Sequence, residues 1–373
     1  MQGLLLYLLV LGSVGFGGPI ALVARMERDL VEKRAWFTLE EFRAGVALAQ
    51  LAPGPLAAQL AMYLAWLRGG WLGSLAGAVA FVLPSFLIVV ALGWWYSTGA
   101  GGTLLQRLFY GFGAVVIAVL ARSAYRLVRR TVGRDVLLIG VAAANAVAVV
   151  GLGRESIPFL FVTGAIPFVW ARRSRFTAGA PVLLPFLPPS FTVAAPTVTT
   201  LGDIVLFFAK SSLVVFGSGL AIVPFLHAEV VGMRGWLTEV QFLDAIAVAM
   251  LTPGPVVITV AFIGWLVAGL GGAAAAALGV FLPTWLVVVL AAPAYARLSR
   301  SATIRLLAQG VTAAATGGLV GAVVLIAARS LVDLPAALLA VAAMVVLAAW
   351  PRLPEPVVLA IGGVLGLVVS AGR

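Results

Sequence analysis

The chain has 373 residues, of which 63% are hydrophobic and 10% are charged, and its formal net charge is +11. A water-soluble protein of this length would need more polar surface to cover its core, so the composition predicts an all-α polytopic membrane protein in a lipid bilayer. The excess positive charge is mostly arginine between apolar segments, which indicates membrane orientation rather than binding of nucleic acid.

Cysteine is absent and His227 is the only histidine. This excludes disulfides, thiolate zinc sites, Fe–S clusters and catalysis by a Cys or His triad. The membrane segments also lack a carboxylate pair or a nucleophile beside a base, so we expect no enzyme activity, no metal site and no cofactor.

In chain order, the first half contains five apolar stretches that are long enough to form membrane helices. The first has no basic n-region and no clear cleavage site, which favours a permanent helix over a signal peptide. The predicted helices lie near residues 3–22, 71–96, 104–121, 135–151 and 156–171.

Residues 38–68 are predicted to form two short helices separated by the sequence PGP at Pro53–Pro55. Both prolines lack a donor N–H and the glycine breaks helical continuity. We interpret this stretch, and residues 238–268 around the second PGP at Pro253–Pro255, as re-entrant hairpins. A single kinked spanning helix remains the alternative.

An internal repeat organises the chain. A shift of 200 residues aligns FGGP at Phe16–Pro19 with FGSG at Phe216–Gly219, and it aligns the two PGP sequences. FVLPSF from Phe81 matches FLPTW from Phe281 after a one-residue adjustment. These matches predict an N-terminal transporter repeat at 1–175, a Pro-rich connector at 176–199 and a C-terminal transporter repeat at 200–373.

The arginines indicate that the two repeats have inverted topology. The loop 97–103 is uncharged and the loop 122–134 holds five arginines, whereas Arg297, Arg300 and Arg305 occupy the second-half equivalent of the uncharged loop. By the positive-inside rule, equivalent loops then lie on opposite sides of the membrane, which requires an odd number of crossings, here five per half. The expected location is a bacterial-type inner (plasma) membrane, and a homodimer is compatible with the sequence.

This topology places the N-terminus outside. The charged residues predicted inside are Arg25, Arg28, Lys33, Arg34, Arg68, the 122–134 cluster, Arg172, Arg173, Arg175, Arg297, Arg300, Arg305 and Arg352; those predicted outside are Arg107, Arg154, Arg234, Arg329 and Arg373.

The PGP, FGGP and FGSG motifs are typical of an anion site. A helix N-terminus offers free N–H groups and a partial positive charge, and in inverted repeats such ends meet near the membrane midplane. Pro55 and Pro255 suit the first helical position. Close packing or kinking by Gly and Pro is the alternative. The candidate substrate-binding residues are Gly17, Gly18, Gln50, Pro53, Gly54, Pro55, Gln59, Lys210, Gly217, Ser218, Gly219, Thr252, Pro253, Gly254 and Pro255, with Thr259 as a further polar neighbour.

Other charged residues have two alternative interpretations. Lys210 lies in an apolar helix and is a candidate anion ligand, although it could snorkel to the interface. Glu27, Asp29 and Glu229 are candidate gating or proton-handling groups, with interfacial amphipathic helices as the alternative. The carboxylates near the start of each PGP hairpin, Glu40, Glu41, Glu239 and Asp244, are expected to stabilise helix starts.

The motifs resemble those of the chromate ion transporter family. The resemblance rests on FGGP, Trp36, EEFRAGVALAQLAPGP, MYLAW and FVLPS in the first half, and on KSSLVVFGSGLAIVPFL, QFLDAIAVAMLTPGP and FLPTW in the second. It covers nearly the whole chain and implies a bidomain carrier that exports chromate, of which sulfate is a tetrahedral analogue. The positions that match the family pattern are Phe16, Gly17, Gly18, Pro19, Gln50, Pro53, Gly54, Pro55, Lys210, Phe216, Gly217, Gly219, Pro253, Gly254 and Pro255.

Two departures from the family pattern concern selectivity: Ser218 replaces an expected glycine, and Met250-Leu251-Thr252 stands where the first half has Gln50-Leu51-Ala52. Uptake or exchange of sulfate or another small oxyanion is therefore the alternative function. The predicted helices show no ladder of Asp, Glu and His residues that would indicate a proton relay, so we expect uniport driven by the membrane potential.

Overall fold

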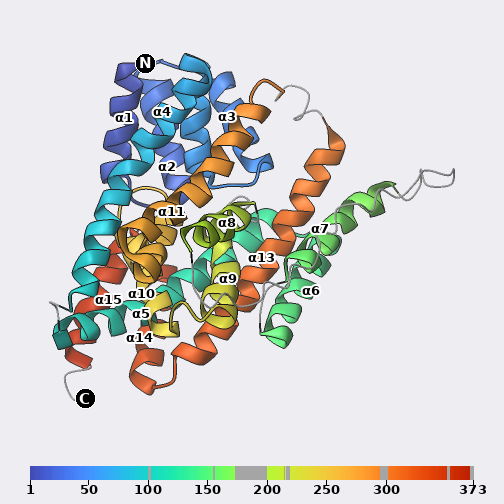
Figure 1. The fold of residues 1–373 in the computed structure, drawn as a ribbon. Helices are drawn as coiled ribbons and strands as arrows, with labels where there is room; N and C mark the ends of the chain where they lie inside the picture. Colours follow the sequence, from blue (N-terminus) through green and yellow to red (C-terminus); the bar gives the residue numbers. More distant parts are fainter. Residues whose placement is uncertain are drawn as a thin grey trace.

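The computed structural model describes residues 1–99, 102–153, 156–172, 200–213, 215, 219–294, 301–350 and 353–369. All regular structure in these ranges is helical. Figure 1 shows the N-terminal helices gathered at one end of the molecule and the C-terminus at the other. The predicted connector 176–199 and the residues Arg154, Arg173, Arg175, Phe216, Gly217, Ser218, Arg297, Arg300, Arg352 and Arg373 lie outside the described ranges.

The helices of the first half follow the predicted boundaries, with two exceptions. The helix predicted at 104–121 continues to Leu127 and then as a π-helix to Val132, so most of the predicted loop 122–134 is helical. Predicted helix 3–22 is two helices, because the chain is non-helical from Gly15 to Gly17, at the predicted FGGP break. The elements are α1 (Gln2–Val14), α2 (Gly18–Met26), the π-helix η1 (Glu27–Lys33), α3 (Leu39–Leu51), α4 (Leu56–Ser97), α5 (Gly102–Leu127), η2 (Val128–Val132), α6 (Val136–Leu152) and α7 (Ile157–Arg172).

The second half repeats this order. Its elements are α8 (Leu201–Ser212), η4 (Gly219–Ile222), α9 (Val223–Leu226), η5 (His227–Met233), α10 (Glu239–Leu251), η6 (Val256–Ile258), α11 (Thr259–Ala291), α13 (Ala302–Ser330), α14 (Leu334–Ala349) and α15 (Glu355–Val369).

Local backbone features recur at equivalent positions of the two halves. Helices α4 and α11 each contain a non-helical step, at Gly69–Gly70 and at Ala268–Gly269. A capping box begins both α3 and α10: the hydroxyls of Thr38 and Thr238 accept N–H groups of the first turn. Glu41 completes the first box, as expected of a helix-start residue.

Four described helices are long and apolar enough to span a bilayer: Leu56–Ser97, Gly102–Val132, Val256–Ala291 and Thr303–Ser330. Six shorter apolar helices have 10 to 17 residues. The chain is therefore a multi-pass membrane protein by the length and composition of its helices.

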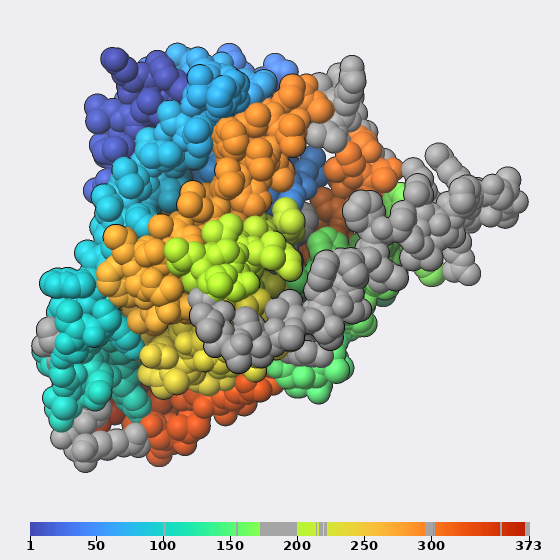
Figure 2. Space-filling view, in the orientation of Figure 1, coloured from blue at the N-terminus to red at the C-terminus, as the bar shows by residue number. Residues whose placement is uncertain are grey.

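The two halves interlock instead of forming separate bodies. The last helices of the first half, α6 and α7, pack against α13, and the last helices of the second half, α14 and α15, pack against α5. Equivalent helices also pair with one another, α4 with α11 and α5 with α13. Figure 2 shows the orange part of the second half lying directly against the blue part of the first.

Glycines allow the closest of these contacts. A Cβ built on Gly310 of α13 would overlap the carbonyl oxygen of Gly164 on α7, and one built on Gly111 of α5 would overlap that of Gly362 on α15. Small residues of this kind let membrane helices approach backbone to backbone, where dispersion contacts rather than the hydrophobic effect hold them together.

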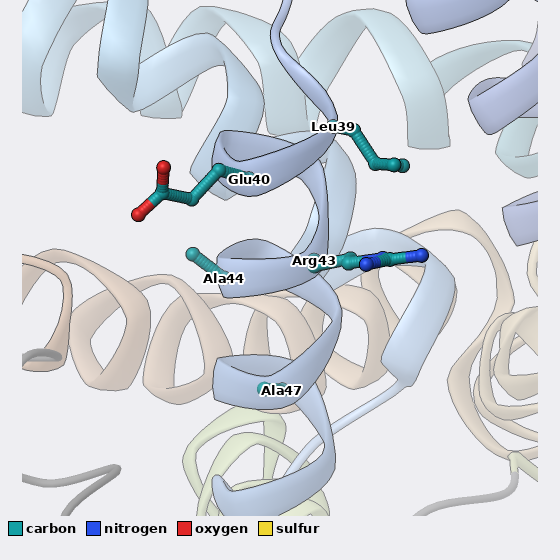
Figure 3. A pocket seen from close by; sticks show the side chains of 5 residues that line it. All are labelled: Leu39, Glu40, Arg43, Ala44 and Ala47. Carbon is teal, nitrogen blue, oxygen red and sulfur yellow. The ribbon is translucent and has the colours of Figure 1, made fainter.

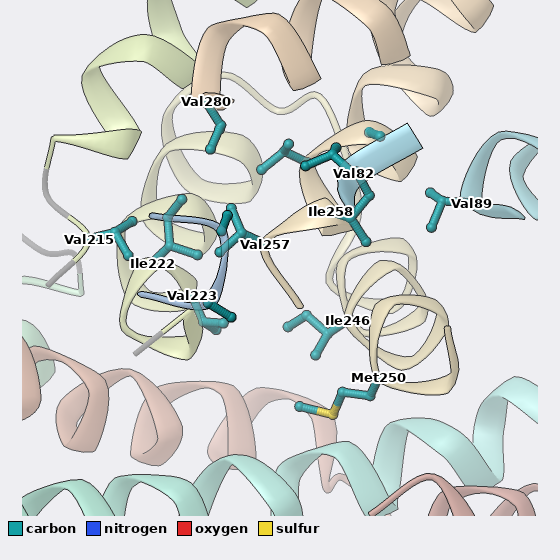
Figure 4. Close-up of a cluster of buried hydrophobic side chains, with 14 of the residues drawn as sticks. Val82, Val89, Val215, Ile222, Val223, Ile246, Met250, Val257, Ile258 and Val280 are labelled. Atoms are coloured by element: carbon teal, nitrogen blue, oxygen red, sulfur yellow. The ribbon is translucent and has the colours of Figure 1, made fainter. Parts of the chain in front are cut away.

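One apolar core lies where the halves meet. It includes Val82 and Val89 of α4, Ile246 and Met250 of α10, and residues of η6 and α11 (Figure 4). Because α10 and η6 flank the second PGP motif, this core fixes the position of that motif relative to the first half.

Candidate functional site

Each PGP motif forms a turn between two helices. α3 ends at Leu51 and α4 begins at Leu56, while Gly54 and Gly254 adopt φ values of +132° and +100° that favour glycine. Pro55 and Pro255 have extended backbone and precede the first helical residue. They are therefore N-cap residues, and the expectation that they occupy the first helical position is wrong by one residue.

The two PGP glycines bond to opposite halves of the chain. The Gly54 amide donates to the carbonyl of Val215 at 2.7 Å, and the Gly254 amide donates to the carbonyl of Gly15 at 2.8 Å. Gly15 and Val215 each directly precede the Phe of an FGGP or FGSG motif. We call these two hydrogen bonds the crossover bonds, and each brings one PGP turn against the predicted helix break of the opposite half.

A long helix of the opposite half covers each PGP glycine. A Cβ built on Gly54 would lie 2.9 Å from Cγ2 of Thr284, and one built on Gly254 would lie 2.6 Å from Oγ of Ser85. Ser85 and Thr284 follow Pro84 and Pro283 in α4 and α11, and both are buried. The turns thus have no room for a side chain at the glycine.

Several predicted donor side chains are satisfied within their own half. Gln59 Nε2 donates to the Pro53 carbonyl at 2.7 Å, and the hydroxyls of Thr252 and Thr259 donate to the carbonyls of Ala249 and Val256. The Gln59 side chain is fully buried, and its Oε1 has no partner among the described residues. Since the bond to Pro53 fixes the amide orientation, Gln59 holds the PGP turn in shape.

Two helix N-termini meet this region without a side-chain cap. α4 begins after Pro55 with the buried residues Leu56, Ala57 and Ala58. α2 begins after Gly17, and a Cβ built on Gly18 would meet nothing within 4 Å. The first-turn amides of a helix have no acceptor within the helix, so both ends present partial positive charge.

The first PGP turn lies at the end of an accessible helix face. Leu39, Glu40, Arg43, Ala44 and Ala47 of α3 line a hollow of about 610 Å³ (Figure 3). Arg43 is exposed and forms no ion pair among the described residues, and Gln50, one turn beyond Ala47, is also exposed. The spacing of Arg43, Ala47 and Gln50 places them on one face of α3 that leads to Pro53.

The second PGP turn follows a closed helix. Every residue of α10 from Phe242 to Met250 is buried. Asp244, which occupies the position equivalent to Ala44, is 3% exposed, and its Oδ2 accepts a hydrogen bond of 2.8 Å from the hydroxyl of Tyr96. Asp244 therefore pairs with Tyr96 and does not cap α10, contrary to the sequence-based expectation.

Charged clusters lie beside both PGP hairpins. In the first half Asp29 contacts Arg25, Arg28 and Lys33 at 3.7, 3.5 and 3.3 Å. Partial burial opposes ionisation of Asp29, but the hydrogen bonds and charges of Lys33 and Arg28 outweigh it and hold the pKa of Asp29 below its usual value. Glu27 is half-buried and forms no ion pair among the described residues.

In the second half Glu239 contacts a histidine and an arginine. Its carboxylate lies 2.6 Å from Nε2 of the buried His227 and 3.1 Å from Arg329. Glu239 thus links η5, α10 and α13, and it is not the carboxylate of a capping box. Glu229 pairs with Arg234 at 3.6 Å.

The remaining predicted residues are less informative. Lys210 lies half-buried in the last turn of α8, two residues before the end of that helix, and Gly219 is buried at the start of η4. Among the described residues there is no group of three or more His, Asp or Glu that could hold a metal ion.

Sequence reasoning missed Arg43 beside the hollow and the contact between Asp244 and Tyr96. The single carboxylate in the apolar run FLDAIAVAML was a usable signal for Asp244. Tyr96 had none, because it reaches Asp244 across 148 residues of sequence.

The apolar helices, their glycine-rich contacts and the paired turns define a polytopic membrane protein. Comparison with protein families matches residues 3–169 and 202–367 to the family described as "Chromate transporter". The chain belongs to the chromate transporter family.

Named relatives extend over nearly the full chain. The chain is 46% identical to a "Probable chromate transport protein" of Synechococcus elongatus over 97% of this chain and 94% of that protein. It is 46% identical to the "Chromate transport protein" of Cupriavidus metallidurans over 99% of this chain and 93% of that protein. A "Chromate transport protein" of Pseudomonas aeruginosa is 31% identical over 74% of this chain and 68% of that protein. No solved structure matches.

Proposed function

We propose that the chain exports chromate across a bacterial inner membrane, with the oxyanion bound between the two PGP turns near the membrane midplane. The observation that carries this proposal is the pair of crossover bonds, from Gly54 to Val215 and from Gly254 to Gly15. Each bond holds one PGP turn against the segment that precedes the FGGP or FGSG motif of the opposite half. The uncapped N-termini of α4 and α2 begin directly after Pro55 and Gly17.

The donors for the anion are backbone amides rather than the PGP residues themselves. Prolines have no N–H, and the amides of Gly54 and Gly254 are used in the crossover bonds. The amides available to a tetrahedral dianion are those of the first turn of α4, at Leu56–Ala58, and the start of α2 at Gly18. These donors favour an anion without trapping it by a full countercharge.

The exposed face of α3 is the proposed route to this site. Arg43 offers the hollow a positive charge at its entrance, and Gln50 offers an amide donor close to the turn. In the proposed inverted topology the first PGP hairpin enters from the inside and the second from the outside. An open α3 and a buried α10 then correspond to an inward-facing conformation.

The proposed architecture has repeats at 1–175 and 200–373, joined by the connector 176–199. Equivalent elements on the two halves, the capping boxes and the helix breaks support this division. In the Cys-free chain, cysteines introduced at Ser97 and Arg329 should react from outside, whereas those at Arg126 and Arg300 should not. Reaction of the Ser97 and Arg300 positions from the same side would exclude the inverted topology.

The membrane potential suffices to drive export. An inside-negative potential acts on each charge with about 2.3 kcal/mol per 100 mV, so two negative charges moving outward gain roughly 4.6 kcal/mol, enough for more than about a thousandfold gradient. Uniport is therefore the first energetic hypothesis for a dianion.

The alternative is uptake or exchange of sulfate or another small oxyanion, which uses the same donors. Proteoliposomes loaded with chromate, sulfate or neither distinguish the functions when the potential is set with potassium and valinomycin. We expect chromate flux that follows the potential without any chemical product. Faster sulfate than chromate flux would favour the alternative, and the absence of flux with either anion would contradict the proposed function.

A further inference from the structure

Asp244 is a buried carboxylate at the junction of the two halves. It lies on α10, it is 3% exposed, and its hydrogen-bond partner Tyr96 lies on α4. Edge-on contacts of Tyr96 with Phe109 and Phe262, at 5.4 Å each between ring centroids, give the pair an apolar surrounding. A carboxylate in such a place is costly in its charged form, because one neutral hydroxyl replaces the water shell.

The neighbouring helices bring Asp244 no compensating charge. The elements packed against α10 are α4, α5, α11, α13, α15, η5 and η6. Three titratable groups on these elements have other partners. His227 and Arg329 contact Glu239, and Glu355 of α15 contacts Arg126.

The other titratable residues on those elements form no hydrogen bond or ion pair with Asp244 in the described part of the chain. They are Tyr63 and Arg68 on α4, Arg107, Tyr110, Arg122, Tyr125 and Arg126 on α5, Glu229 on η5 and Arg305 on α13, and α11 and η6 contain none.

The same two helices that hold this pair also build the second PGP turn. α10 leads directly into Thr252 and Gly254, and α4 supplies Ser85, which lies against Gly254. Eight helical residues separate Asp244 from Thr252, which corresponds to a rise of about 12 Å. At this separation and an intermediate dielectric, a charged carboxylate weakens binding of an anion roughly tenfold for each charge of that anion.

The first half shows that the turn itself does not require this carboxylate. Its α3 carries Ala44 at the equivalent position, and its PGP turn forms the same kind of crossover bond. Asp244 thus gives the second half a buried carboxylate that the first half lacks.

We propose that Asp244 is a proton-binding site linked to oxyanion binding, so that the protein takes up a proton on this carboxylate when the anion binds near the PGP turns. The inference rests on the proposed oxyanion transport. The proton comes from solvent and converts the carboxylate to the neutral acid, which removes its repulsion of the anion. Tyr96 positions the carboxyl group in either state, since its hydroxyl both donates and accepts.

The test is binding-linked proton uptake by the purified full chain. Sodium chromate is added in weak buffer near neutral pH, a pH dye reports proton uptake, and labelled chromate reports binding in parallel. The wild type should take up as much as one more proton for each bound anion than Asp244→Asn, and comparing the two cancels the titration of chromate itself. Glu32→Gln, which changes an exposed carboxylate on η1 outside the lining of the hollow, should match the wild type.

A second pair of measurements separates proton binding from a structural role. Tyr96→Phe should retain the proton uptake with a shifted pH midpoint, because the carboxyl group remains and only its donor is lost. If Asp244→Asn does not insert, infrared difference spectra of the wild type should show a gain of protonated carboxyl on adding chromate. Equal uptake by wild type and Asp244→Asn, or no such infrared band, would overturn the inference. Absence of chromate binding by the wild type would instead contradict the proposed function.

Discussion

The two PGP hairpins have the same backbone but different surroundings. Both have a capping box, a glycine with positive φ and a crossover bond. α3 nevertheless exposes Arg43 and Gln50 beside a hollow, whereas α10 is buried from Phe242 to Met250. The features that both hairpins share therefore form the turn. The features that differ set how exposed the helix before each turn is.

The largest expected effect comes from the feature that both hairpins share. In Gly254→Ala the new Cβ would lie 2.6 Å from Ser85 Oγ, on a residue with φ of +100°. The positive φ and the overlap should each cost about 1–3 kcal/mol, which is enough to displace the turn and abolish oxyanion flux. Flux in proteoliposomes and insertion judged by gel filtration would measure this.

Gly133→Ala is the matched control, because Gly133 also has a positive φ, of +58°, but its Cβ would meet nothing within 4 Å. Its ψ of −121° lies outside the left-handed helical region, so this variant should reduce stability by about 1–3 kcal/mol and leave flux unchanged. Equal loss of flux in both variants would show that strain alone, and not the crowded turn, causes the defect.

The next prediction concerns the difference in access. Cysteines at Gln50 and Met250 occupy equivalent positions in a chain that has no cysteine of its own. Gln50 is exposed and Met250 is 6% exposed, so the first cysteine should react with a water-soluble maleimide and the second should not. Labelling rates of the two single-cysteine proteins in vesicles test this.

The same labelling experiment can be repeated under conditions that favour an outward-facing protein. In the proposed alternating mechanism, an outward-facing protein should protect the cysteine at position 50 and expose the one at position 250. Equal reactivity of both positions under all conditions would remove the distinction between the hairpins.

The shared and differing features also mark the limit of what the sequence predicts. Gly and Pro act through their own backbone, so the PGP turns, the FGGP break and the positions of most helices could be predicted. The packing of α6 and α7 on α13, and of α14 and α15 on α5, could not, because equivalent glycines are compatible with packing within one half.

The candidate site was predictable to a similar extent. The motifs identified the right turns, but the use of the Gly54 and Gly254 amides in crossover bonds depends on carbonyls more than 150 residues away. For the same reason Gln59 was predicted as a ligand donor, whereas its amide N–H bonds Pro53. Tertiary hydrogen bonds decide which donors remain for an anion.

A smaller effect is expected when the positive charge of Arg43, which lies beside the hollow, is removed. Arg43→Gln removes an exposed cation from the proposed route, and attraction of a dianion through partly screened solvent contributes about 1 kcal/mol, or roughly fivefold in the half-saturating oxyanion concentration. Initial rates at several ionic strengths should show the difference shrinking as salt increases. Glu40→Gln should change the half-saturating concentration in the opposite direction, and identical values for all three proteins would exclude this role of the hollow.

The smallest expected effect is on the pH dependence of stability, and it comes from Glu239 on α10. Burial opposes ionisation of Glu239, at the partly exposed start of α10, but His227 and Arg329 hold its pKa below the usual 4.5. A depressed carboxylate pKa stabilises the fold fully above the unfolded-state value, and this stabilisation is lost as the pH falls through the folded-state value. The melting temperature of the wild type should therefore fall below about pH 4.5 by more than that of Glu239→Gln. The contribution should stay near 1 kcal/mol, because Arg329 is exposed to solvent and screening weakens its part. Parallel melting curves for the two proteins between pH 7 and pH 3 would show that the contacts of Glu239 with His227 and Arg329 add no pH-dependent stability.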